Sequence, residues 1–371
     1  MGAPVTRIFR SPSAYVQGRH VIDNIGEHAQ TDGSRAVIIA DPAVRGIVGD
    51  SIRSGLEATG LTTDFVDFGG TCTDSGIDRA AEEAEGADLV VGAGGGRTLD
   101  TAKAVAARHD TRMVTVPTIA STDAPTSSLS VVYTEEGEFE ELRFHGVHPD
   151  LVLVDTAVIA AAPIRFFRSG IADAIATRFE AETAIEAGAE NVFGGQSTRA
   201  ARAIARECFR TVEAHGESAL AAVERDAVTK NVESVVEAAT LLSGIGFESG
   251  GLAAAHAVHD GLTRIEPTHD ATHGEKVNIG TLTQLVLEGR DIEEFHDIVD
   301  LSLDLNLSVT LAQIGLTDPS DEQLRTIAEA ACQPQETIHN EPFDVSPEAV
   351  REALVTADEL ARQRRNTREP G

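Results

Sequence analysis

The chain has 371 residues, of which 42% are hydrophobic and 24% are charged, enough for two domains of a globular protein. Its formal charge is −30, from 60 acidic and 30 basic residues, and its lysines are limited to Lys103, Lys230 and Lys276. Such an acidic surface repels nucleic acids and anionic membranes, so we expect neither of them as a partner.

Short apolar segments alternate with helical patterns over roughly the first 160 residues, a length typical of one domain. Buried strands are predicted at residues 36–41, 63–68, 88–91, 112–116 and 151–155. Helices are predicted between several of them, at residues 43–59, 76–85 and 98–108. This alternation predicts an α/β domain with a Rossmann-like parallel sheet covered on both faces. Residues 128–134 and 139–144, joined by Glu135 to Glu138, predict a hairpin.

Alanine-rich helical patterns replace the strand patterns after Pro163. They cover residues 170–188, 197–214, 231–243, 249–260, 273–289, 293–304, 321–332 and 347–365. We therefore predict an α/β domain over residues 1–163 and an all-α helical domain over residues 164–371. Helical bundles build metal sites from side chains on facing helices, so the second domain is where we look for one.

The predicted strand at 88–91 runs into a glycine-rich turn, residues 92–96, and then into a helix. Such a turn presents bare backbone N–H groups at a positive helix end, where a diphosphate can approach closely. Arg97 replaces the last glycine of the GxGxxG pattern, so a purely structural turn is the alternative.

Two further segments suggest what the turn would bind. Asp41 ends an earlier strand, where it can accept from a ribose hydroxyl and repel a 2′-phosphate, which favours NAD over NADP. The alternative is an ordinary turn aspartate before Pro42. Residues 117–128 carry many hydroxyls and one carboxylate, Asp123, and suit a polyhydroxylated ligand.

Histidines gather in the helical half of the chain. His256 and His259 lie at i, i+3 in a small-residue segment, and His273 is expected to begin the next helix. Asp173 lies in another small-residue helix. One aspartate with two imidazoles on three facing helices would form a zinc site with an open fourth position. Packed core histidines are the alternative. His259 and His269 are candidates for supporting a metal ligand or relaying a proton, or they are simply polar residues.

Four segments are similar to the glycerol dehydrogenases, within the metal-dependent (iron-type) alcohol dehydrogenase superfamily. They are GGGRTLDTAK (residues 94–103), PTIASTDAP (117–125), LLSGIGFESGGLAAAH (241–256) and HGEKV (273–277). The resemblance implies a dehydroquinate synthase-like fold, with NAD bound by residues 1–163 and with metal and substrate bound by residues 164–371.

The resemblance also implies a set of site residues. Asp173, His256 and His273 would bind the metal and the substrate, and Asp123 would contact substrate hydroxyls. We assign catalytic roles to Asp123, His256 and His259. The residues expected to contact NAD are Asp41, Gly94, Gly95, Gly96, Arg97, Thr98, Thr118, Ser121, Ser127, Leu129 and Tyr133.

The chain departs from its relatives at two positions. Arg97 stands where many relatives have lysine, which keeps the charge but changes the donor geometry. Thr177 stands where iron-type relatives often have a fourth ligand, a histidine one turn after the aspartate. A three-ligand zinc site is therefore expected, with Fe²⁺ as the alternative metal.

These features predict a reversible, NAD-dependent oxidation of glycerol and other vicinal diols to a ketone, which for glycerol is dihydroxyacetone. The alternatives are an sn-glycerol-1-phosphate dehydrogenase and a catalytically silent nucleotide-binding regulatory protein. The expected partner is a small polyol. Relatives form homo-oligomers, so we expect an assembly between a dimer and an octamer.

We expect a cytoplasmic protein. The amino-terminal segment lacks the apolar stretch of a signal peptide, and no stretch approaches about 18 uninterrupted apolar residues. Cys72, Cys208 and Cys332 are far apart and suggest neither a disulfide framework nor a CxxC metal pair, which fits a reducing compartment.

The acidic, lysine-poor composition predicts a halophilic protein, because concentrated salt screens the repulsion between carboxylates. The melting temperature should therefore rise across a salt series from dilute buffer to molar potassium chloride. Full stability in dilute buffer would contradict this prediction.

Overall fold

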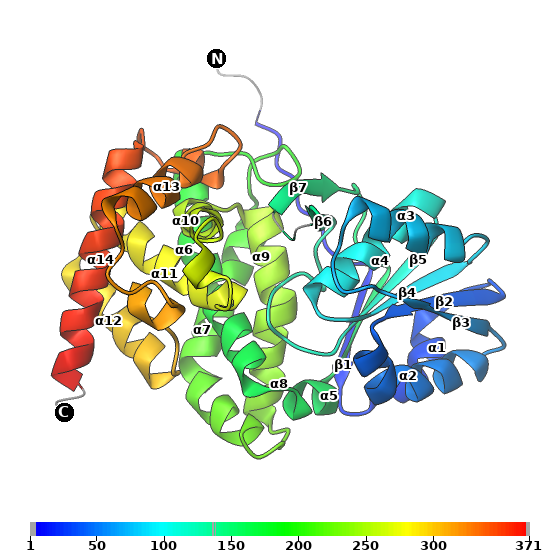
Figure 1. Cartoon of the computed structure of the whole chain (residues 1–371). Coiled ribbons are helices and arrows are strands. Elements are labelled where there is room, and N and C mark those ends of the chain that lie inside the picture. The colour runs from blue at the N-terminus through cyan, green and yellow to red at the C-terminus, as the bar shows by residue number, and fades with distance from the viewer. Residues whose placement is uncertain (1–4, 136, 138, 369–371) are drawn as a thin grey trace. The chain divides into compact units, whose positions relative to one another are not determined.

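The computed structural model describes residues 5–135, 137 and 139–368, and they form two compact units (Figure 1). The first, called here the sheet unit, comprises Arg10–Phe167 and Ala221–Gly244. The second, the helical unit, comprises the residues up to Phe9, Arg168–Leu220 and the residues from Ile245 onward. The predicted domain bounds, 1–163 and 164–371, stay a prediction. A single boundary cannot describe the compact units, because Ala221–Gly244 packs with the sheet.

The sheet unit is built on six parallel strands in the order β1-β8-β5-β4-β2-β3. Their bounds are β1 Ala14–Gly18, β2 Arg35–Ala40, β3 Thr62–Asp67, β4 Leu89–Gly94, β5 Arg112–Pro117 and β8 Leu151–Asp155. The five predicted strands and their parallel arrangement are confirmed. The prediction missed β1, a short edge strand whose residues are half-buried or exposed, so its sequence lacks the apolar run of a central strand.

Helices cover both faces of this sheet, as the alternating pattern predicted. Neighbouring residues of β2 point to opposite faces: Ile38 packs with Ile52 on one face, and Val37 packs with Ile77 and Val105 on the other. The helices are α1 Ile25–Ala29, α2 Pro42–Glu57, α3 Asp74–Glu83, α4 Gly96–His109, α5 Thr156–Ala161 and α8 Lys230–Glu237, with a short 3-10 helix, η1 Val21–Asn24, and a π-helix, η2 Ala238–Leu242. The order of the strands reverses between β2 and β4, the kind of place where open α/β sheets bind ligands.

The predicted hairpin is also confirmed. Strands β6 (Leu129–Tyr133) and β7 (Phe139–Phe144) pair antiparallel as a separate two-stranded sheet. Residues 136 and 138 of its predicted turn lie outside the described residues.

The helical unit contains long helices, and their positions in the sequence agree closely with most of the predicted alanine-rich segments. Its helices are α6 Ile164–Ala187, α7 Arg199–Val223, α9 Ser243–Gly250, α10 Ala254–Leu262, α11 His273–Leu287, α12 Ile292–Asp304, α13 Asp321–Ala331 and α14 Pro347–Arg368, of which α6, α7 and α9 have end residues in the sheet unit. Short turns are η3 Glu266–Thr268, η4 Leu311–Ile314 and η5 Thr337–Asn340. Within the described chain, each helix is too short or too polar to cross a membrane.

The prediction of one continuous helix over residues 249–260 is wrong. The chain leaves the helical conformation after Gly250, and Gly251 has a φ of 110°, a conformation that side chains other than glycine rarely adopt. The new helix α10 starts at Ala254, so His256 lies in its first turn rather than at the end of a longer helix.

Candidate metal centre and nucleotide-binding turn

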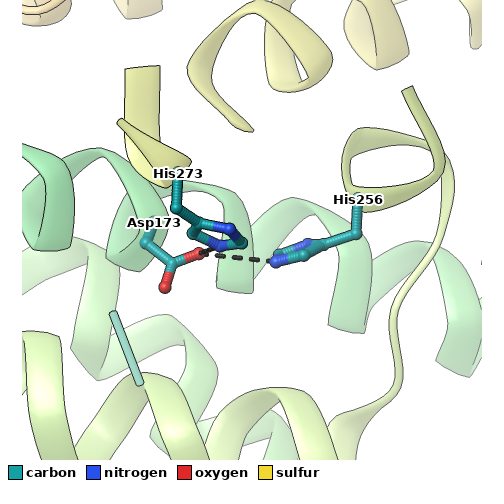
Figure 2. A group of neighbouring side chains, drawn as sticks. All are labelled: Asp173, His256 and His273. Atoms are coloured by element: carbon teal, nitrogen blue, oxygen red, sulfur yellow. Dashed lines mark hydrogen bonds and ion pairs between the residues drawn. The ribbon is translucent and has the colours of Figure 1, made fainter. Parts of the chain in front are cut away.

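Asp173, His256 and His273 come together in the helical unit. They lie on α6, α10 and α11, and one ligand atom from each lies within 4.8 Å of the others. The Nε2 atoms of His256 and His273 are 3.4 Å and 3.2 Å from Oδ1 of Asp173. Figure 2 shows both rings directed at the carboxylate. One carboxylate oxygen and two imidazole nitrogens therefore converge on one point, which is a donor set suited to zinc or ferrous iron.

Small residues allow the three helices to approach closely enough for this convergence. A Cβ at Gly274 would lie 1.9 Å from the carbonyl oxygen of Ser169 on α6. A Cβ at Gly280 would lie 2.1 Å from the carbonyl oxygen of Ala255 on α10. The beginning of α11 is also fixed by a capping box between Thr272 and Glu275, which sets the position of His273.

Glu180 holds His256 in place from the side away from Asp173. Its Oε2 accepts from Nδ1 of His256 at 2.6 Å, which leaves Nε2 of that ring turned toward Asp173. Its Oε1 accepts from the backbone N–H groups of Ala253 and His256, at 3.0 Å each, where α10 begins. A carboxylate on the remote nitrogen of a histidine is the usual support of a metal ligand. The sequence prediction missed Glu180, although it follows Asp173 by two helical turns and so lies on the same face of α6.

Burial and mutual attraction set the charges of this cluster. Burial opposes ionisation of Asp173, whose side chain has 0% exposure, but the imidazoles of His273 and His256 hold its pKa well below its usual range. Burial lowers the pKa of His256, and the carboxylates of Glu180 and Asp173 outweigh that effect and raise it. The site therefore stabilises positive charge between two buried carboxylates.

The other two candidate histidines lie in different surroundings. The His259 ring centre is 4.3 Å from that of His273, and its Nδ1 contacts Oδ1 of Asp260 at 2.8 Å. Burial and the neighbouring His273 lower the pKa of His259 to about 4. His269 is exposed and bonds through Nε2 to the carbonyl oxygen of Thr263, so the structure does not bring it into the cluster. Thr177 donates its hydroxyl to the carbonyl oxygen of Asp173.

In the sheet unit, the predicted nucleotide-binding residues follow three adjacent strands, β2, β4 and β5, at the same edge of the sheet. After β4 the chain turns at Gly94, which has a φ of 155°, and Gly95 precedes the first residue of α4. Among the described residues, no side chain caps this end of α4, so the first backbone N–H groups of the helix could bind an anion. Thr118, which follows β5, donates its N–H to the carbonyl oxygen of Gly94.

The remaining predicted NAD contacts lie around this turn, and some of them already make polar contacts within the protein. Arg97 is exposed, and its guanidinium lies 4.7 Å from the ring centre of Tyr133 on β6. Asp41 accepts from the N–H of Val44 and so caps α2, which agrees with the alternative of an ordinary turn aspartate before Pro42. Thr98 is buried in the first turn of α4, and Ser121 is half-buried in the loop after β5.

Lys103 ties α4 to the loop that follows β5. Its ammonium lies 2.7 Å from Oδ1 of Asp100 and donates to the hydroxyl of Ser127 and the carbonyl oxygens of Ala124 and Leu129. Burial raises the pKa of Asp100, although Lys103 opposes that shift. Two of the four partners, Ser127 and Leu129, are predicted NAD contacts. The prediction included Lys103 in a helix but missed this role.

Asp123 lies in the same loop and is half-buried. The hydroxyl of Ser243 donates to its Oδ2 at 3.2 Å, and its carbonyl oxygen accepts from the N–H and hydroxyl of Thr126. Within the sheet unit, these bonds fix the Asp123 backbone and one of its carboxylate oxygens.

Replacing Lys103 by methionine should lower the free energy of unfolding by about 3–5 kcal/mol, because it leaves the Asp100 charge buried without its counter-charge. Urea unfolding followed by circular dichroism measures the change. Lys230→Met, at an exposed lysine, is the matched control and should change stability by less than about 0.5 kcal/mol. Equal stability of the two variants would contradict the anchoring role of Lys103.

Glu180→Gln should weaken zinc binding by roughly 10–100-fold, because it removes the charge that orients His256 and strengthens its basicity. Competition against a chromogenic chelator measures the affinity. The control is Glu186→Gln, an exposed glutamate on the same helix. If both variants bind zinc as the unmodified chain does, Glu180 has no supporting role.

Known proteins match this chain over nearly its whole length. A glycolaldehyde reductase from Halobacterium salinarum is 54% identical over 98% of this chain and 100% of its own length. A glycerol dehydrogenase from Escherichia coli is 45% identical over 96% of this chain and 98% of its own. The Halobacterium match fits the halophilic character expected from the net charge.

The comparison of structures agrees. The crystal structure of glycerol dehydrogenase from Schizosaccharomyces pombe superposes with a TM-score of 0.96 at 38% identity, over 98% of this chain and 93% of that one. The predicted fold class is thereby confirmed. The model of the iron-containing alcohol dehydrogenase family matches residues 12–156. The chain belongs to this family and is an alcohol oxidoreductase.

Proposed function

We propose that this protein is an NAD-dependent glycerol dehydrogenase, which reversibly oxidises glycerol and related vicinal diols, with dihydroxyacetone as the product from glycerol. The observation that carries the proposal is the convergence of Asp173, His256 and His273 within 4.8 Å of one another. The glycerol dehydrogenase from Escherichia coli, at 45% identity, supports the choice of substrate.

The proposed metal ligands are Asp173, His256 and His273, and zinc is the proposed ion, with ferrous iron as the alternative. Three protein ligands leave a coordination position open, as catalytic sites do. When bound, the metal supplies a Lewis acid that lowers the pKa of an alcohol hydroxyl. Adjacent hydroxyls can share one cation, so diols should be preferred over simple alcohols.

The chain's own residues position the reactants. Glu180 keeps His256 turned toward Asp173. We assign Asp123 to a hydrogen bond with a substrate hydroxyl. His259 is assigned to proton transfer because its ring lies beside the proposed ligand His273, with 4.3 Å between the ring centres, and its Nδ1 contacts Asp260.

NAD, when bound, supplies the hydride acceptor. We propose that its diphosphate binds at Gly94, Gly95, Gly96 and Thr98, where α4 begins without a side-chain cap. Asp41, Arg97, Thr118, Ser121, Ser127, Leu129 and Tyr133 are the further proposed contacts. The Lys103 anchor would keep the loop with Ser127 and Leu129 in a single conformation before the cofactor arrives, which reduces the entropy lost on binding.

A phosphorylated substrate is disfavoured by the surroundings of the single lysine among the described residues of the helical unit. This lysine, Lys276, is buried and donates to the carbonyl oxygens of Thr268 and Ala271. A phosphate group would need a cationic donor of this kind, but Lys276 already donates to the backbone. We therefore do not favour sn-glycerol 1-phosphate as the substrate.

Reduction of glycolaldehyde is the second candidate function. It is favoured by the 54% identity with the glycolaldehyde reductase of Halobacterium salinarum. Glycolaldehyde also has oxygens on neighbouring carbons, so the same donor set suits both compounds. We further propose a cytoplasmic homo-oligomer; the free cysteines, of which Cys72 and Cys208 are buried, support a reducing compartment.

The test is an absorbance assay at 340 nm in high salt. Glycerol with NAD, and dihydroxyacetone with NADH, should give turnover that a chelator abolishes and zinc restores. sn-Glycerol 1-phosphate should give none, and a larger kcat/KM for glycolaldehyde than for dihydroxyacetone would favour the second candidate. Absence of turnover with all of these substrates would contradict the proposal.

Alanine at Asp173, His256 or His273 should lower kcat by at least about 10³-fold while NAD still binds, because each variant loses a metal ligand but leaves the sheet unit unchanged. Cofactor binding is measured by calorimetry. The control is His269→Ala, at the histidine outside the cluster, and it should retain activity. Full activity of any one of the three ligand variants would refute the metal assignment.

A further inference from the structure

One face of helix α7 carries a concentration of positive charge on a chain whose net charge is −30. Arg199, Arg202, Arg206 and Arg210 follow one another at intervals of three or four residues along the helix. Arg199, Arg206 and Arg210 are exposed, and Arg202 is half-buried. They line a shallow groove of about 340 Å³. Glu207 also lines this groove and Glu182 pairs with Arg206, so two carboxylates offset part of the charge of the four arginines. The arginines still outnumber the carboxylates, which leaves this face able to accept further negative charge from a partner.

The same face continues into a negative half. Glu213 and Glu217 are exposed and lie further along α7. At about 100° per residue, the four arginines and the two glutamates fall within a sector of about 80°. The face is thus basic in its amino-terminal half and acidic in its carboxyl-terminal half.

This order of charges is unfavourable for the helix on its own. Acidic residues stabilise the first turn of a helix, whereas the first turn of α7 carries Arg199 and Arg202 and no acidic residue. Within the described chain this cost is offset only in part. Arg206 pairs through Nε with Glu182 at 2.5 Å, and Glu207 lies beside the arginines, whereas Nε of Arg202 is buried without a hydrogen-bond partner among the described residues. Because these arginines are unfavourable for α7 itself, we expect them to have a role in contact with another molecule.

We propose that α7 is a self-complementary interface on which a second copy of this chain docks, with the two α7 helices antiparallel about a twofold axis. The junction of Thr211 and Val212 is the midpoint between Arg210 and Glu213 and also between Arg206 and Glu217. A twofold axis at that junction therefore places each of these arginines opposite a glutamate of the partner subunit. In a twofold interface every such pair occurs twice, so two residue pairs yield four ion pairs.

The acidic half of the face favours a second copy of this chain over a polyanion as the partner. A nucleic acid or another polyanion would meet Glu213 and Glu217 as well as the arginines, and these carboxylates would repel it. A second α7 presents the opposite charge at every one of the four positions. Direct ion pairs also persist in concentrated salt better than long-range attraction, because the screening length falls to about 3 Å at 1 M.

Charge reversal on the full-length chain tests this interface. One variant, Arg206→Glu with Arg210→Glu, makes the central face acidic; a second, Glu213→Arg with Glu217→Arg, makes it basic. Sedimentation velocity at one fixed salt concentration should show each variant alone at half the mass of the unmodified protein or less. An equimolar mixture of the two, and the chain with all four substitutions, should both regain the original mass.

The control reverses two exposed arginines elsewhere, Arg325→Glu on α13 and Arg362→Glu on α14, and should leave the mass unchanged. Thermal melting verifies that each variant is folded; where a double variant is not, Arg210→Glu and Glu213→Arg replace it. A monomeric unmodified protein, unchanged mass in the reversal variants, or a mixture that does not reassociate would overturn the proposal. Loss of mass in the acidic variant alone would assign the arginines to an anion instead.

Discussion

The buried carboxylate of Asp173 is the constraint on which the arrangement of the helical unit depends. Its side chain has no exposure, and an ionised carboxylate without compensating partners is too costly to bury. Compensation comes from His256 and His273, on two other helices, so α6, α10 and α11 are held in the one arrangement that satisfies it. Gly274 and Gly280 are required for the same reason, since any side chain there would push α11 away.

The charges around His256 also explain why a divalent cation suits this cluster. Asp173 and Glu180 are both buried carboxylates, and they contact opposite nitrogens of the His256 ring. With both imidazoles neutral, the two carboxylates leave a charge of about −2 in a dry site, which a divalent ion would balance. Without the ion, the same two carboxylates outweigh the effect of burial and raise the pKa of His256, whose protonation balances part of this charge.

Much of this architecture could be predicted from the sequence, because it depends on local patterns. The glycine turn after β4 and the small-residue segments around Asp173 and His256 each carry a recognisable signal. Glu180 was missed, because its role depends on where α10 begins, and that position is set by the break at Gly251. Lys103 was missed because three of its partners lie more than 20 residues away in the sequence, a contact that periodicity cannot reveal. The α7 face required the bounds of one uninterrupted helix, since the predicted segment stopped at residue 214 and excluded Glu217.

The central claim, that Asp173, His256 and His273 together hold a catalytic metal, is tested most directly by X-ray absorption spectroscopy of the zinc-loaded protein at the zinc K-edge. We expect nitrogen and oxygen ligands at about 2.0–2.2 Å, with the multiple-scattering signature of two imidazoles and no sulfur. The imidazole signature should fall by half in His273→Ala. A protein that does not retain zinc, or a sulfur shell at about 2.3 Å, would contradict the account.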